Sequence, residues 1–291
     1  MQSKSAVAIF LLLGIVWGSN FIYMKWASDF ITPLQVVLVR VLFGFIPVLI
    51  YALYKKVIKI EHFKYSFHFF MMSLLGTTVY YFFFVKATSL LLSGVTGALS
   101  GSIPLFAFLL GIIFLKEEKL DRRIIGIFIG MLGVIFISKP FDTNLFESNL
   151  EGIVDIILGS LIVGSSFVYA KRFLSPLKIH FAALTTYQLG FALITLLFIT
   201  DLNGLTSITN DTHVFLGSVI GLGLLGTGLA FILYYYLIEN LGAIAASSAT
   251  YLPPVVALII GYFFIDEDID LIDCLGTILI FGGVFLVNNK K

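Results

Sequence analysis

The stretch VWGSNFIYMK, residues 16–25, returns in the second half of the chain as IVGSSFVYAK, residues 162–171. Both copies carry Gly-Ser, then a small polar residue, and then Phe, Tyr and Lys at the same spacing. The copies lie 146 residues apart in a chain of 291 residues. A repeat of this length indicates that the chain is built from two similar halves.

The composition is that of a membrane protein with several spans. Hydrophobic residues make up 59% of the chain and charged residues 12%, which is about half the charge of a typical soluble domain. The formal net charge of +1 argues against the basic surface that nucleic-acid binding needs. Cys274 is the single cysteine, so an internal disulfide and a cysteine-based metal site are both excluded. We interpret the first apolar segment as an uncleaved span, because it is too long for the core of a signal peptide.

Ten apolar windows predict ten membrane-spanning helices, since about 20 residues at 1.5 Å per residue cross about 30 Å of hydrocarbon. The expected class is an all-α membrane protein, because lipid cannot pair the open backbone of any other unclosed structure. No gap between windows is long enough for a soluble domain, so residues 1–291 are expected to form a single transmembrane domain. The windows are 5–26, 33–54, 67–86, 91–115, 121–139, 152–171, 180–200, 213–238, 243–265 and 271–288.

Basic residues are distributed unequally between the two sides of the membrane. With the N-terminus inside, 14 of the 18 Lys and Arg residues fall on the inner side and three on the outer side, while Arg40 lies within a span. The three on the outer side are Lys25, Lys86 and Lys139. The positive-inside rule therefore predicts a multi-pass protein of the plasma membrane, the bacterial inner membrane, with both termini cytoplasmic.

The repeat of the opening stretch continues through five spans. Gly44-Phe45 matches Gly190-Phe191 at the same offset of 146, and an offset of 150 relates the later matches, as one loop insertion would produce. The first repeat covers residues 5–139 and the second covers residues 152–288. The later matches pair Gly76-Thr77 with Gly226-Thr227, Pro104 with Pro254, Gly111 with Gly261, Glu117 with Glu267, Gly126 with Gly276 and Gly133 with Gly283.

Five spans in each repeat place the two copies upside down relative to each other, because five is an odd number. The charges agree, since the turn LKEEKLDRR of the first copy carries four basic residues and its counterpart IDEDIDLID carries none. Inverted repeats are typical of secondary transporters, in which the substrate binds near the midplane between the copies. The expected fold is ten transmembrane helices arranged as two inverted five-helix repeats around a central cavity.

The chain resembles the EamA-type branch of the drug/metabolite transporter superfamily over essentially its whole length. The resemblance is carried by VWGSNF in the first span, LVRVLFG around Arg40 in the second, PLFAFLLGIIFLKEE at 104–118 and PVVALIIGYFFIDED at 254–268. It implies a basket of helices, with spans one, three, four, six, eight and nine around a central cavity. It also implies export or import of amino acids and other small metabolites. The second copy departs from the family pattern at Asp266, where glycine is common.

Two prolines, Pro104 and Pro254, lie at matched positions inside predicted spans and are expected to kink them, because proline removes a helical hydrogen bond. The carbonyls left unpaired belong to Ser100 and Thr250, four residues earlier. Two hydroxyl residues at matched kinks are candidates for substrate contact. The alternative is that neighbouring hydroxyls and water only repair the backbone.

Trp17 and Asn20 share one face of the first span, and Val163 and Ser166 hold the equivalent places in the sixth. An aromatic face beside an amide suits a small zwitterion, and the resemblance implies that both spans border the cavity. The alternative is polar contact between helices, which is worth about 0.6 kcal/mol on average. Trp17, Asn20 and Ser166 are therefore candidate cavity residues.

Arg40 is a charged residue inside the second span, where a central arginine costs roughly 2.5–3.5 kcal/mol on insertion. Its guanidinium is suited to bind a carboxylate through two parallel hydrogen bonds. The alternative is that the side chain extends to the membrane surface and serves topology.

Tyr80, Tyr169 and Tyr251 complete the candidate cavity residues. The alternative for them is an aromatic belt, which tyrosines near a membrane interface also form.

Other patterns bear on partners and on catalysis. Several glycine pairs fit packing within one bundle or a homodimer, so a monomer and a homodimer both remain open. The four histidines show no pair at metal-binding spacing, and we find no nucleophile–base constellation and no phosphate-binding loop. We therefore expect no metal, no cofactor and no enzyme activity. The glycine pairs are Gly97–Gly101, Gly126–Gly130 and Gly217–Gly221.

The sequence favours a secondary transporter, a permease or exporter of small polar metabolites such as amino acids, that works by alternating access in the lipid bilayer. A nucleotide-sugar carrier is the alternative within the superfamily. Its phosphates call for several cationic groups, and only Arg40 and Lys86 are available. A non-transporting scaffold or sensor is a further class, which does not explain an inverted repeat.

Overall fold

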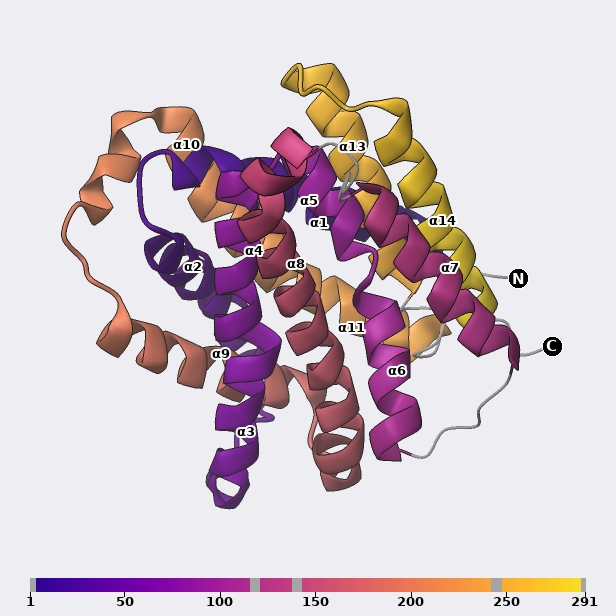
Figure 1. Cartoon of the computed structure of the whole chain (residues 1–291). Coiled ribbons are helices and arrows are strands. Elements are labelled where there is room, and N and C mark those ends of the chain that lie inside the picture. The colour runs from indigo at the N-terminus through magenta and orange to yellow at the C-terminus, as the bar shows by residue number, and fades with distance from the viewer. Residues whose placement is uncertain (1–3, 116–120, 138–142, 242–247, 289–291) are drawn as a thin grey trace.

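The computed structural model describes residues 4–115, 121–137, 143–241 and 248–288, and all of its regular elements are helical (Figure 1). Residues 243–247 of the predicted ninth span and 138–139 of the fifth lie outside the described residues. So do residues 116–120, which form most of the LKEEKLDRR turn. The structural statements below concern the described residues.

The first half begins with two long helices and continues with two interrupted ones. The third predicted span is a composite in which a π-helical turn, η2, separates two α-helices, and the fourth divides into α5 and α6. The elements are α1 (Lys4–Ser28), α2 (Pro33–Tyr54), η1 (Ile60–Tyr65), α3 (Ser66–Ser73), η2 (Leu74–Thr78), α4 (Val79–Leu90), α5 (Ser93–Ser100), α6 (Ile103–Leu115) and α7 (Asp121–Ile137).

The second half has the same succession of long and interrupted helices. A long π-helical segment, η6, lies in its third span, as η2 does in the first half. The elements are α8 (Thr143–Tyr169), η3 (Ala170–Leu174), η4 (Ser175–Leu177), α9 (Phe181–Ile199), η5 (Leu205–Asn210), α10 (Thr212–Leu216), η6 (Gly217–Leu229), α11 (Ala230–Leu241), η7 (Ser248–Tyr251), α13 (Leu252–Phe264) and α14 (Leu271–Asn288).

Seven helical stretches in the described part are long and apolar enough to cross a membrane, and three shorter apolar helices accompany them. The shorter helices are Ile124–Ile137, Leu252–Phe264 and Leu271–Leu286. Large apolar side chains on the outer surface of the bundle, such as Phe198 at 86% exposure, suit contact with lipid. The chain is a helical membrane protein.

The start of α2 illustrates how local sequence sets a helix boundary and joins the two halves. The Thr32 hydroxyl caps the helix by accepting a hydrogen bond from the Gln35 N–H, and the Gln35 side-chain oxygen accepts one from the Thr32 N–H. Pro33 occupies the first turn. The Gln35 amide also donates to the carbonyls of Asp201 and Asn203, at 2.7 and 2.8 Å. A capping residue of the first half therefore binds the loop that follows α9.

α7 and α14 pack side by side along one edge of the bundle (Figure 1). Their contact has no room for side chains at two glycines. A methyl group on Gly133 would collide with the carbonyl of Gly276, and one on Gly283 would collide with the carbonyl of Gly126. As the numbering rises along α7 it falls along α14, so the two helices are antiparallel.

Close packing also joins the first helix of each half to the fourth span of the other. A methyl group on Gly18 of α1 would collide with Val256 of α13. A methyl group on Gly164 of α8 would lie 2.9 Å from the backbone nitrogen of Ala107 and 3.1 Å from Phe106 Cβ of α6. Small residues at these positions let the backbones approach as they do in other membrane bundles.

Candidate functional site

Arg40 lies at the centre of a buried polar cluster that includes both halves of the chain. Its side chain comes from α2 and the residue is 5% exposed. Nε donates a hydrogen bond to Thr227 Oγ1 at 3.0 Å, and the guanidinium carbon lies 3.7 Å from the centre of the Tyr81 ring. Nη1 lies 3.8 Å from Met24 Sδ. The side chain therefore stays inside the bundle and does not extend to the surface.

Asn20 of α1 completes this arrangement. With its amide oriented to satisfy both neighbours, its nitrogen donates to the Val16 carbonyl at 3.1 Å and its oxygen accepts from Arg40 Nη2 at 3.2 Å. No described carboxylate forms an ion pair with Arg40. Hydrogen bonds and the Tyr81 π-face stabilise the buried cation, but its charge is not neutralised. Such a site favours an anionic group.

Tyr80 lies next to this cluster. Its ring centre is 4.4 Å from that of Tyr81, on which the Arg40 guanidinium stacks. Three predicted cavity residues, Asn20, Arg40 and Tyr80, are thus brought together by α1, α2 and α4.

A second polar contact repeats the Arg40–Thr227 bond with the roles of the halves exchanged. Gln188 of α9 donates to Thr77 Oγ1 at 2.8 Å and to the Gly76 carbonyl at 3.0 Å. Thr77 lies in the π-helical turn η2, and Thr227 lies in the π-helical segment η6. π-Helical turns inside membrane helices are frequent at functional sites. Each half therefore presents a threonine to a long polar side chain of the other half.

Trp17 and Tyr169 lie in other apolar clusters of the bundle. The Trp17 ring packs against Tyr234, with the ring centres 5.6 Å apart, in the cluster around Leu13. The Tyr169 hydroxyl lies 2.7 Å from His68 Nδ1 and joins α8 to α3. Both residues contact the opposite half of the chain, and they belong to other apolar clusters than the one that contains Tyr80 and Tyr81.

Two of the predicted hydroxyl residues, Ser100 and Ser166, donate hydrogen bonds within their own helices. Ser100 donates to the Gly97 carbonyl at 2.6 Å, and Ser166 donates to the Val163 carbonyl at 2.7 Å. Both residues are buried. η7 carries Thr250 and Tyr251, and the Tyr251 side chain lies outside the described part of the structure.

The two prolines lie in the first turns of helices and not in the middle of a continuous one. The fourth span is interrupted at residues 101–102, and Pro104 is the second residue of α6. Pro254 is the third residue of α13, which follows the 3-10 turn η7. A proline in a first turn leaves no missing hydrogen bond, because the first N–H groups of a helix have no helical acceptor. The kinks predicted at Pro104 and Pro254 are therefore points at which one helix ends and the next begins.

Lys86, counted above as a basic residue outside the membrane, lies within α4 and joins it to α8. Its Nζ is 2.8 Å from Glu151 Oε1 and 3.0 Å from Asp155 Oδ2. The Asp155 side chain is almost fully buried. Lys86 is thus neutralised by two carboxylates, in contrast to Arg40.

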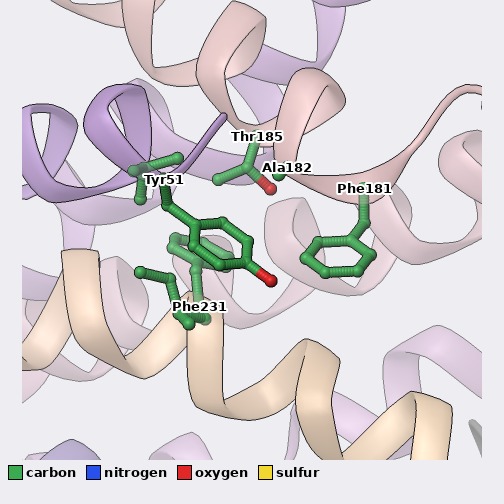
Figure 2. Close-up of a pocket in the computed structure, with 7 residues that line it drawn as sticks. Tyr51, Phe181, Ala182, Thr185 and Phe231 are labelled. Carbon is green, nitrogen blue, oxygen red and sulfur yellow. The ribbon is translucent and has the colours of Figure 1, made fainter. Parts of the chain in front are cut away.

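A small apolar pocket lies between α2, α9 and α11. Figure 2 shows the rings of Tyr51, Phe181 and Phe231 around it. Its cavity volume is about 10 Å³, far below the roughly 300–1,000 Å³ of typical ligand pockets, and no predicted cavity residue lines it. We therefore assign the candidate site to the Arg40 cluster.

Sequence reasoning missed Tyr81, Thr227 and Gln188. Thr227 and Thr77 carried a signal, because the two Gly-Thr pairs match between the repeats. Tyr81 follows Tyr80 directly, in an aromatic stretch that is also typical of a belt at the membrane surface. Gln188 had no counterpart in the first repeat that would have drawn attention to it.

The comparisons with known proteins agree with this architecture. The model of the EamA-like transporter family matches residues 4–139 and again residues 150–289. The uncharacterized transporter YoaV of Bacillus subtilis is 26% identical over 275 residues, covering 94% of this chain and 92% of its own length. The uncharacterized inner membrane transporter YedA of Escherichia coli K12 is 28% identical over 288 residues, covering 98% and 90%.

A solved crystal structure has the same fold. It superposes with a TM-score of 0.60 at 18% sequence identity and covers 98% of this chain and 97% of its own. The family model matches most of the chain in two copies, and the relatives align over nearly all of it. The chain belongs to the EamA-like transporter family.

Proposed function

We propose that this transporter is a secondary carrier for small polar metabolites such as amino acids, working by alternating access between two inverted five-helix repeats. The observation that carries the proposal is the buried cluster of Arg40, Asn20, Tyr81 and Thr227, which belongs to both halves and has a cation without a carboxylate partner among the described residues. A substrate carboxylate there would gain a charge-assisted hydrogen bond.

The contacts of α7 with α14 support the inverted arrangement of residues 5–139 and 152–288. Gly133 is matched with Gly283, and Gly126 with Gly276, by the sequence repeat. The contact of Gly133 with Gly276 is therefore the counterpart of the contact of Gly283 with Gly126. Reciprocal contacts between equivalent, antiparallel helices are what a two-fold axis in the membrane plane produces.

Exchanged contacts elsewhere support the same relation. α1 packs on α13 as α8 packs on α6, through the matched glycines Gly18 and Gly164. α2 packs on η6, and α9 packs on α3 and η2. These helix contacts fit a bundle of ten spans in which the three shorter apolar helices also cross the membrane. The interrupted fourth span and the turn before α13 supply the broken helices that such carriers use around a substrate.

In this proposal the remaining candidate residues line the path of the substrate through the protein. Ser100 and Thr250 immediately precede the helix changes at Pro104 and Pro254. Ser166, Trp17, Tyr169 and Tyr251 lie on spans that the family resemblance assigns to the cavity. A nucleotide sugar is a weaker candidate substrate, because Lys86 is neutralised by Glu151 and Asp155.

Transport by the purified protein tests this function. We expect proteoliposomes to accumulate at least one compound from a panel of the twenty L-amino acids and small carboxylates. Uptake is measured with and without a pH gradient as the driving force. Protein-free liposomes serve as the control. If every compound fails in both uptake and counterflow, the proposal of a carrier for such metabolites is wrong.

Orientation in the bacterial inner membrane is a separate part of the proposal. The relative YedA is described as an inner membrane transporter, and 14 of 18 basic residues lie on one side in the predicted topology. Reporter fusions after Lys64 and Lys291 are expected to report a cytoplasmic location, and a fusion at Asn210 an external one. An external location at Lys291 together with a cytoplasmic one at Lys64 would contradict ten spans.

A further inference from the structure

Glu267, in the loop between α13 and α14, binds the start of α5 with its side chain. Oε1 accepts a hydrogen bond from the Ser93 N–H at 2.6 Å, and Oε2 accepts one from the Gly94 N–H at 2.8 Å. The first N–H groups of a helix have no helical acceptor and carry partial positive charge. A carboxylate at that position therefore forms two charge-assisted bonds.

The surroundings of Glu267 hold the carboxylate in this position. A methyl group on Gly261 would lie 2.5 Å from Oε2, and one on Gly94 would lie 3.3 Å from it. The Glu267 N–H donates to the Gly261 carbonyl at 2.9 Å, and Asp266 takes a left-handed φ of 51° that turns the chain toward α5. Gly94 and Gly261 thus leave space for the Glu267 carboxylate, and the left-handed conformation of Asp266 positions it.

The contact joins the two halves at a helix that has a joint at its other end. α5 belongs to the first half and Glu267 to the second. α5 carries Ser100 at its C-terminal end, and the helix is interrupted before α6 begins at Ile103. A short helix that is fixed at one end by a side chain and jointed at the other can change its position without unfolding.

We propose that Glu267 is the residue that holds α5 in place to close the transport path on the side of the membrane where α5 begins, and that α5 is released when that side opens. This inference rests on the proposed function, because it requires alternating access. In the predicted topology the closed side is the outside. Lys86 with Asp155, and Gln35 with Asp201, also join the halves on that side, but neither contact holds a jointed helix.

Side-specific labelling of one cysteine tests the inference without knowledge of the substrate. Cys274 is exposed and is first changed to serine, and Ser100→Cys then reports on the path. A membrane-impermeant maleimide is applied to the outer or the inner side of membrane vesicles. We expect Glu267→Gln to increase outside labelling about tenfold and to reduce inside labelling, because the change replaces one of the two accepting oxygens with an NH2 group, which cannot accept the second N–H bond.

Two further variants separate this role from general loosening of the protein. Asp268→Asn removes a neighbouring exposed carboxylate and should leave both labelling rates unchanged. Ser93→Pro removes a donor from the opposite side of the contact and should act like Glu267→Gln. Leu92 already has the extended conformation, with ψ of 141°, that precedes a proline, and proline is tolerated at the first position of a helix.

The possible outcomes distinguish the inference from the proposed function. Labelling from one side in the parent, unchanged by Glu267→Gln and Ser93→Pro, would overturn the role of Glu267 alone. An equal rise on both sides would also overturn it, since that is the effect of a merely structural residue. If the cysteine at position 100 is inert from both sides in every variant, the central path itself is wrong and the inference fails with it.

Discussion

Replacing Arg40 with lysine should lower the transport rate at least tenfold in protein that still folds. The guanidinium bonds Thr227 and Asn20 at once and stacks on Tyr81, whereas an ammonium group has no planar fork and cannot make all three contacts. Each lost charged hydrogen bond is worth about 1.5–3 kcal/mol, and 1.4 kcal/mol corresponds to tenfold. Initial uptake rates of the identified substrate in proteoliposomes measure the effect.

Arg172→Lys is the matched control for this change. The Arg172 guanidinium is exposed and, among the described residues, donates to the Phe114 carbonyl alone, at 3.2 Å, so transport should remain within about twofold. Thr227→Val removes the acceptor of the central bond and should also reduce transport. Near-normal uptake by Arg40→Lys would remove Arg40 from the binding site and leave it a topological role.

Gly283→Ala should reduce the amount of folded protein more than any other single methyl group added to α14. The new Cβ would lie 2.5 Å from the Gly130 nitrogen and even closer to the Gly126 carbonyl, and these backbone atoms cannot rotate away. Overpacking typically costs about 1–3 kcal/mol, and contact with backbone is at the upper end of that range. The melting temperature in detergent, followed by size-exclusion chromatography, measures the loss.

The neighbouring residue provides the control. A Cβ on Gly282 would meet no atom within 4 Å, and alanine is the better helix former by about 1 kcal/mol. Gly282→Ala should therefore match or exceed the parent in thermal stability. Equal stability of the two variants would mean that α7 and α14 do not pack as closely as described.

The positions of the helices could be predicted from the sequence, because about 20 apolar residues in a row can only form a spanning helix in lipid. In the part of the chain that the structure describes, seven long apolar helices and three shorter ones lie within or across the predicted windows. Pro104 predicted a kink in the fourth window, but a complete break at residues 101–102 was not predicted, since hydropathy does not respond to a helix break. The π-helical segments η2 and η6 were not predicted either, because hydropathy does not distinguish them from α-helix.

Only part of the candidate site could be predicted. Arg40 and Asn20 are polar in an apolar window, so composition alone marks them out. Thr227 and Gln188 acquire their roles by lying opposite Arg40 and Thr77, and that depends on which helices pack together. Tyr169 could be recognised as polar but not as the partner of His68, because the contact joins residues 101 positions apart.

The pairing of α7 with α14 has a consequence for the synthesis of the protein. α7 ends at Ile137 and its main partner begins at Leu271, and the intervening chain takes roughly 7–27 s to make at about 5–20 residues per second. Throughout that time Gly126 and Gly133 of α7, which contact α14 in the folded protein, are without that partner. The first half of the protein therefore cannot complete its fold until α14 has been synthesised and inserted.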